Sequence, residues 1–187
     1  MANHALLIMD VQRAIVDRFA EGADALLDAL GRAADAARSA GIPVVYVRIA
    51  FRPGAPEISR RNRGFAALAG APGFGDEDEA TEIHPQIAPR PGDIVVLKKR
   101  VSGFAGSDLD VVLRSLSADA LVLSGIATSG VVLSTLRQAA DLDYELTVLR
   151  DGCSDTDAEV HRVLLDKVFP RQAAVLTVDE WTKAISR

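Results

Sequence analysis

Six short apolar runs recur along the chain, and most of them lack the alternation of polar and apolar residues that marks a half-exposed strand. Continuous apolar runs bounded by turn residues are typical of strands that are buried on both faces of a parallel sheet. The pattern therefore predicts six strands, at residues 5–9, 43–49, 93–97, 120–124, 144–149 and 173–178.

Between these runs, apolar residues recur at the spacing of amphipathic helices. The predicted helices cover residues 24–40, 108–116, 128–140, 158–168 and 180–185, with Gly41 just past the end of the first and Thr128 or Ser129 as the N-cap of the third. Strands that alternate with helices indicate right-handed crossovers and a parallel sheet. We therefore expect one α/β domain over residues 1–187, a three-layer sandwich around a mainly parallel six-stranded sheet.

Residues 50–90 are the exception, because they hold most of the prolines, a basic cluster and an acidic run at 76–79. A loop of this length in a compact domain is usually a lid or an oligomer contact. The guanidinium groups could bind a substrate carboxylate, or they could form a solvated or inter-subunit charge patch. The members of the basic cluster are Arg52, Arg60, Arg61 and Arg63.

Composition narrows the class of protein. A net charge of -5 gives no reason to expect nucleic acid or an anionic membrane as a partner, and no apolar run approaches the roughly 20 residues needed to cross a bilayer. The single cysteine, Cys153, excludes an internal disulfide framework and fits a reducing compartment. Because the N-terminus also lacks the basic region of a signal peptide, we expect a cytoplasmic protein.

No cofactor or metal is expected. No glycine follows the first strand, where a dinucleotide fingerprint would begin. The three histidines, His4, His84 and His161, are scattered along the chain and form no pair with the spacing of metal ligands.

Three chemically interesting features follow predicted strands. Asp10 ends the first strand, Lys98 ends the third, and the turn 125–130 leads from the fourth strand into a helix. In a parallel sheet the carboxyl ends of strands share one edge, which is where open α/β folds bind ligands. Asp10 alone could be a local turn cap, but an acid and an amine that face a helix N-terminus form a plausible reactive site.

The motifs at these strand ends resemble those of the isochorismatase-like (cysteine hydrolase) family. The similarity rests on Leu-Leu-Ile-Met-Asp-Val-Gln at 6–12, Lys-Lys-Arg-Val-Ser-Gly-Phe at 98–104, Ser-Gly-Ile-Ala-Thr-Ser-Gly-Val-Val-Leu-Ser-Thr at 124–135 and Asp-Gly-Cys-Ser-Asp at 151–155. The resemblance implies a strand order of 3-2-1-4-5-6, a homo-oligomer, a small-molecule substrate and a cis peptide bond between Ile126 and Ala127.

Carried over by position, the resemblance assigns Asp10 as the catalytic acid and Lys98 as the catalytic lysine. Lys99 fits less well, because successive side chains of a strand point to opposite faces. The family's nucleophilic cysteine falls on Val131, which cannot attack a carbonyl. Cys153 matches a segment that is not catalytic in the family, and we interpret it as a small buried hydrophobe. The two histidines that accompany an Asp in the zinc site of nicotinamidase relatives are missing.

The loss of the cysteine decides the expected chemistry. Some isochorismatases lack that cysteine and hydrolyse a vinyl ether by acid catalysis, so the resemblance implies that a protonated Asp10 could do the same here. Burial would raise the pKa of Asp10 and Lys98 would lower it, and the sequence leaves the balance open. The alternatives are a binding protein without turnover and an amidase that uses Ser129 or Ser134. The expected substrate-binding residues are Gln12, Arg48, Arg52, Ile126, Ala127, Thr128, Ser129, Gly130 and Ser134.

Overall fold

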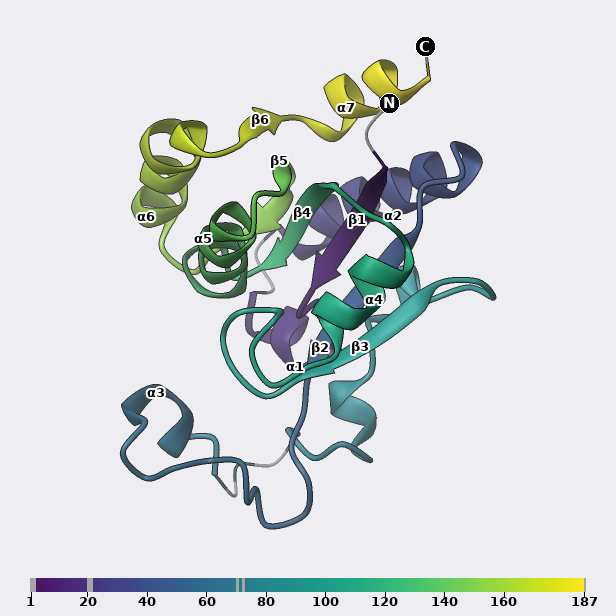
Figure 1. Ribbon diagram of the computed structural model, residues 1–187. Helices are drawn as coiled ribbons and strands as arrows, with labels where there is room; N and C mark the ends of the chain where they lie inside the picture. The colour runs from purple at the N-terminus through teal and green to yellow at the C-terminus, as the bar shows by residue number, and fades with distance from the viewer. Residues whose placement is uncertain (1–2, 20–21, 70, 72, 187) are drawn as a thin grey trace.

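The fold is a twisted parallel sheet covered by helices on both faces. The structure, a computed structural model, describes residues 3–19, 22–69, 71 and 73–186. Within these residues, six strands form one sheet in the order β3-β2-β1-β4-β5-β6, and every neighbouring pair is parallel (Figure 1). The predicted sheet and strand order are therefore confirmed. The strands are β1 (His4–Met9), β2 (Val44–Ile49), β3 (Ile94–Lys98), β4 (Ala120–Ile126), β5 (Glu145–Ser154) and β6 (Ala174–Leu176).

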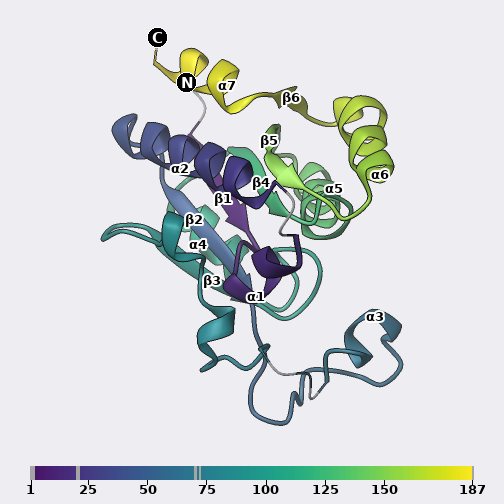
Figure 2. The ribbon, with the colours of Figure 1, turned by 180° about the vertical axis from the view of Figure 1, so that it is seen from behind.

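Helices on the two faces enclose separate apolar clusters. The longest helix, α2 (Ala23–Ser39), packs on one face together with α7 (Val178–Ile185), and α4 (Leu109–Ser115) and α5 (Leu133–Asp141) pack on the other. Figure 1 shows α4 in front of the sheet, and Figure 2 shows α2 in front when the molecule is turned round. The remaining α-helices are α1 (Arg13–Val16), α3 (Arg63–Ala66) and α6 (Ala158–Val163).

The strand register brings the carboxyl ends of the central strands to one level. Met9 pairs with Val47 on one side and with Gly125 on the other. Gly125 has a φ of 130°, and a Cβ at this position would lie 2.0 Å from the carbonyl oxygen of Met9. Only glycine fits such a close approach of two backbones. This contact fixes the turn after β4 beside Asp10.

The structure corrects several predicted boundaries. Strand β5 continues past Leu149 to Ser154, because a register shift opposite residues 123–125 lets Cys153 pair with Gly125. The second half of β5 contains polar residues, so the apolar run that predicted this strand ends at Leu149, before the strand does. Conversely, β6 stops at Leu176, since Thr177 and Glu180 form a capping box that starts α7. The predicted helix 158–168 is α6 followed by a π-helical turn, η5 (Leu164–Val168).

The irregular segment between β2 and β3 folds partly on itself. Its first half, residues 50–69, 71 and 73–75, is called the arm below and projects away from the sheet with α3 at its far side (Figures 1 and 2). Phe51, Phe65 and Phe74 form a small apolar cluster, in which the rings of Phe51 and Phe65 meet edge to face at 6.0 Å. The second half adds two short 3₁₀ helices, η2 (Glu79–Thr81) and η3 (Pro85–Ile87).

Candidate active site

Asp10 and Lys98 form an ion pair at the carboxyl edge of the sheet. Lys98 Nζ lies 2.8 Å from Asp10 Oδ2, and the two side chains are 1% and 9% exposed. Asp10 follows β1 in the left-handed region, with φ 57°, and its N–H donates to the carbonyl of Val47 at 2.8 Å. Aspartate is among the few residues with a side chain that tolerate this conformation. The structure thus brings together two of the predicted residues.

The ammonium group of Lys98 has no donor left over. Besides Asp10, it donates to the carbonyl oxygens of Arg100 at 2.8 Å and Val101 at 3.2 Å. An ammonium has three N–H groups, so these partners use all of them. Lys98 therefore holds and polarises Asp10 and has no hydrogen left for a substrate. The neighbouring Lys99 points elsewhere, as predicted, and bonds the carbonyl of Ala50 at 2.6 Å.

Asp10 has the free acceptor and the altered acidity that acid–base chemistry needs. Burial raises its pKa to about 6 and outweighs the lowering effect of Lys98, which answers the question that the sequence left open. While Oδ2 is held by Lys98, Oδ1 is buried and has no hydrogen-bond partner among the described residues. A carboxyl group with this pKa can exchange a proton through Oδ1 near neutral pH.

The turn after β4 lies beside this pair. The peptide bond between Ile126 and Ala127 is cis, as the resemblance implies. The helix then begins with a π-helical turn, η4 (Thr128–Val132), whose N-cap is Ala127. The prediction of Thr128 or Ser129 as a side-chain N-cap was wrong. Thr128 is fully buried, and its hydroxyl instead bonds the carbonyl of Ser154 at 3.1 Å.

The two serines lack the partners of an activated nucleophile. Ser129 is exposed, and its backbone N–H donates to Asp155 Oδ2 at 2.7 Å. Ser134 is half-buried on α5. Within the part of the chain that the structure describes, neither hydroxyl bonds a carboxylate or an imidazole. A serine nucleophile needs such a base, so the geometry gives no support to this alternative.

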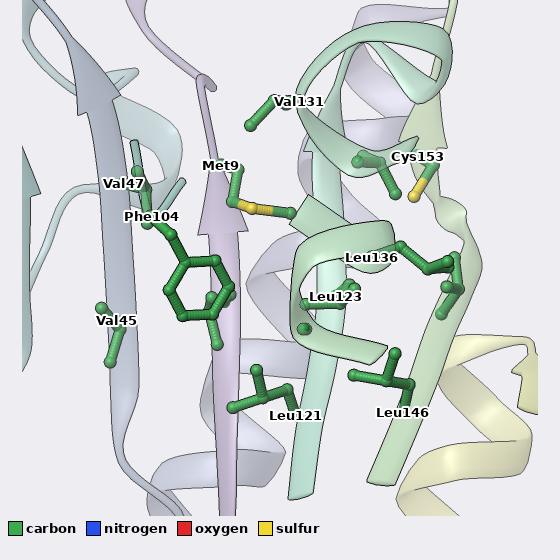
Figure 3. Close-up of a cluster of buried hydrophobic side chains, with 14 of the residues drawn as sticks. Met9, Val45, Val47, Phe104, Leu121, Leu123, Val131, Leu136, Leu146 and Cys153 are labelled. Atoms are coloured by element: carbon green, nitrogen blue, oxygen red, sulfur yellow. The ribbon is translucent and has the colours of Figure 1, made fainter. Parts of the chain in front are cut away.

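Val131 and Cys153 both belong to the apolar core above the sheet. Val131 is 2% exposed, and Figure 3 shows it near Met9, whereas Cys153 lies on β5, beyond β4. Burial raises the pKa of the Cys153 thiol to about 12, which keeps it protonated at neutral pH. The thiolate is the reactive form of cysteine, so Cys153 has the character of a small buried hydrophobe.

Of the predicted binding residues, Gln12 and Arg48 bond other parts of the protein, whereas the Arg52 side chain is 68% exposed. Gln12 is 1% exposed, and its amide bonds both the N–H and the carbonyl of Ile49, at 2.7 and 2.9 Å, and the carbonyl of Thr81 at 2.9 Å. Arg48 bonds the hydroxyl of Thr81 at 3.0 Å, and Arg52 lies 3.5 Å from Glu57. Gln12 and Arg48 thus fasten the segment around Thr81 to the end of β2, a structural role that spacing alone did not reveal.

Among the described residues, no metal-binding cluster or membrane-spanning helix accompanies the pair. Across residues 3–19, 22–69, 71 and 73–186, no group of three or more His, Cys, Asp and Glu residues could hold an ion. His84 instead caps η3, where its Nδ1 accepts the N–H of Gln86 at 3.4 Å. No helix in the same part of the chain is both long and apolar enough to cross a bilayer.

The family model for the isochorismatase domain matches residues 4–180. The chain belongs to the isochorismatase family. Isochorismatase-family protein YecD of Escherichia coli O157:H7 is 30% identical over 184 residues, which cover 97% of this chain and 95% of YecD. Ureidoacrylate amidohydrolase RutB of Variovorax paradoxus (strain S110) is 33% identical over 211 residues, which cover 99% of this chain and 82% of RutB.

Solved structures of isochorismatase-family proteins share the fold. N-carbamoylsarcosine amidase from Thermoplasma acidophilum superposes with a TM-score of 0.80 at 27% identity and covers 96% of this chain and 98% of its own. An isochorismatase family protein from Desulfovibrio vulgaris subsp. vulgaris str. Hildenborough gives a TM-score of 0.88 at 25% identity, with both chains fully covered. The protein is thus an isochorismatase-family hydrolase with the α/β fold that the sequence predicted.

Sequence reasoning missed the groups that contact Lys98 and the turn after β4 from inside the protein. The carbonyls of Arg100 and Val101 accept the remaining hydrogens of the Lys98 ammonium. Asp155 and His161 bond Ser129 and Thr128 in the turn after β4. Every residue has a backbone carbonyl, so the sequence does not show which carbonyls accept a hydrogen bond from a side chain. The only available signal was the clustering of Asp155 and Asp157 at the start of α6, where Asp157 caps the helix.

Proposed function

We propose that the protein hydrolyses a small molecule at the carboxyl edge of β1 and β4, with Asp10 as the acid–base group and without a cysteine nucleophile. The observation that carries the proposal is the Asp10 carboxyl group. One of its oxygens is held by Lys98, the other has no partner among the described residues, and its pKa is raised to about 6. Perturbed acids in such surroundings are typical of catalytic sites.

Vinyl-ether hydrolysis is the reaction that fits these groups best. Protonated Asp10 donates its proton to the terminal carbon of the enol ether, and the electron pair of the ether oxygen forms an oxocarbenium ion. Water adds to this cation, and its released proton returns to the Asp10 carboxylate. The hemiketal then breaks into a carbonyl compound and an alcohol. Lys98 stabilises the carboxylate that forms in the first step, because the pair is already in contact at 2.8 Å.

Hydrolysis of a ureido or amide bond is the second candidate, and the names of two relatives favour it. RutB is a ureidoacrylate amidohydrolase, and the Thermoplasma protein is an N-carbamoylsarcosine amidase. With Val131 at the expected nucleophile position, ionised Asp10 would have to activate water as a general base. The two candidates require opposite protonation states of Asp10, so the pH profile separates them: the acid-catalysed rate falls as pH rises through about 6, and the base-catalysed rate rises.

The test is turnover of isochorismate, ureidoacrylate and N-carbamoylsarcosine by the purified protein and by Asp10→Asn. Asparagine keeps the size of the side chain and tolerates the left-handed backbone at this position. Asp143→Asn is the matched control, because Asp143 has a similar φ of 64° and lies in a turn at the other end of the sheet, before β5. We expect Asp10→Asn to lose turnover by a factor of about 100 or more and the control to keep it.

A binding protein without turnover remains the alternative from a different class. It predicts no turnover of any panel compound by the wild type, with binding that is visible in calorimetry. Val131→Cys then tests for a lost nucleophile, since amide cleavage that appears only in this variant would identify a former cysteine hydrolase. Full activity of Asp10→Asn on any panel substrate would refute the proposed role of Asp10.

Three further expectations accompany this proposal. We propose that the protein forms a homo-oligomer, that it acts in the cytoplasm, and that residues 1–187 form a single domain. Light scattering after size-exclusion chromatography tests the first, and the cooperativity of thermal unfolding tests the last.

A further inference from the structure

His161 lies behind the turn that follows β4, although nothing in its sequence context pointed there. This half-buried residue of α6 places its Nδ1 2.8 Å from the hydroxyl oxygen of Thr128. The same hydroxyl donates to the carbonyl of Ser154 at 3.1 Å. Thr128 is fully buried, so its hydroxyl is shared between these two partners and not with solvent.

Counting hydrogens fixes the protonation of the ring. A carbonyl oxygen can only accept, and a hydroxyl has a single hydrogen to give. Both contacts are therefore hydrogen bonds only if Thr128 donates to Ser154 and accepts from His161. The neutral imidazole must then carry its proton on Nδ1. Burial lowers the pKa of His161, which favours the neutral ring.

A second contact from the same part of the chain holds the next residue of the turn. The N–H of Ser129 donates to Asp155 Oδ2 at 2.7 Å. Ser154, Asp155 and His161 all come from the end of β5 and the start of α6, so one connection braces the first residues of η4. These residues directly precede Gly130 and Val131 in the chain.

We propose that His161 is a positioning residue that acts through Thr128 to hold the turn 127–130 in place beside Asp10. The inference rests on the proposed function in one respect, namely that this turn borders the reacting atoms. His161 does not touch the substrate. It donates Nδ1–H to the Thr128 hydroxyl and so directs the hydroxyl hydrogen to Ser154, which ties the turn to the end of β5.

Three substitutions at one position test this role. In His161→Asn, the carboxamide nitrogen can occupy the place of Nδ1 and donate to Thr128, whereas in His161→Gln the longer side chain places its nitrogen nearer to Nε2. His161→Ala has no donor. The matched control is Arg162→Ala, an exposed position on the same helix. Hydrogen exchange of the Ser129 and Gly130 amides reports the opening of the turn without any substrate.

We expect exchange about fivefold faster in His161→Ala and His161→Gln, the effect of one neutral hydrogen bond, and close to wild type in His161→Asn and Arg162→Ala. Values of kcat/KM for isochorismate and N-carbamoylsarcosine should follow the same order. The ¹⁵N resonances of the imidazole should show the neutral ring protonated on Nδ1. Equal exchange in the Asn, Gln and Ala variants, or a neutral ring protonated on Nε2, would overturn the inference.

The result that would refute the proposed function differs from the result that would refute the role of His161. If Asp10→Asn keeps full turnover, the assignment of Asp10 is refuted, while the exchange rates and the imidazole resonances still decide the role of His161. If Asp10→Asn is inactive and the three His161 variants are indistinguishable, Asp10 keeps its role and His161 loses its own.

Discussion

Replacing Lys98 by methionine should raise the pKa of Asp10 well above about 6. In the wild type, burial raises this pKa and the ammonium at 2.8 Å lowers it. A single opposite charge in contact typically lowers the pKa of a carboxyl group by roughly 1–3 units. Without it, the pKa of Asp10 should move to roughly 7–9. At pH 7 the carboxyl is then about half protonated or more, against about a tenth in the wild type.

The assay needs no substrate. The ¹³Cγ resonances of aspartate-labelled protein are followed from pH 4 to pH 10, and the Asp10 signal is identified by its absence in Asp10→Asn. Lys99→Met is the control, because the amine of Lys99 bonds the carbonyl of Ala50 and should leave Asp10 near 6. Lys98→Arg keeps the positive charge and should also leave the pKa of Asp10 near 6.

The stability of Lys98→Met should depend on pH in a defined direction. An unpaired buried carboxylate costs about 3–5 kcal/mol, but protonation of Asp10 limits this cost at acidic pH. Because the folded-state pKa lies above the unfolded value, stability is lost as pH rises toward the new folded pKa and is regained on acidification. An Asp10 that titrates in Lys98→Met at or below its wild-type pKa would refute the assignment of Lys98 as the group that holds the carboxylate.

Three other changes have clear expected outcomes. Since the folded-state pKa of Asp10 is raised from 3.8 to about 6, the unfolding free energy of the wild type relative to Asp10→Asn should fall by about 3 kcal/mol between roughly pH 3.5 and 6.5; chemical denaturation at each pH measures it, and a constant difference contradicts it. Gly125→Ala should abolish folding, as judged by circular dichroism, because its Cβ would lie 2.0 Å from a backbone oxygen of β1, whereas Gly130→Ala, with its nearest contact at 3.8 Å, should fold. Gln12→Ala should cost about 2–4 kcal/mol, because it removes three buried hydrogen bonds, and the exposed Gln86→Ala less than about 1; similar melting temperatures for the two would show that Gln12 is not a clamp.

The roles of Gln12, Arg48 and Thr128 show where sequence reasoning about the site reached its limit. All three are polar residues next to strand ends, which is where a ligand-binding residue is expected. In the structure, Gln12 and Arg48 bind Thr81, which is 69 residues from Gln12 in the chain, and Thr128 binds Ser154 and His161. A polar side chain near a site bonds either a ligand or another part of the chain, and only the folded position of that other part decides between them.

The sequence by itself determined the layers and the edge of the sheet that carries Asp10 and Lys98, whereas the strand order was implied by the resemblance of its motifs to a known family. The layers and the edge follow from the apolar runs and from the alternation of strands with helices. The acidity of Asp10, the saturation of the Lys98 ammonium by acceptors and the contact between His161 and Thr128 were decided by the tertiary structure alone. Each depends on burial or on a contact within about 3 Å between residues remote in sequence. The pKa of a buried group is set by desolvation and by the distance to nearby charges, and both quantities are defined only in the folded structure.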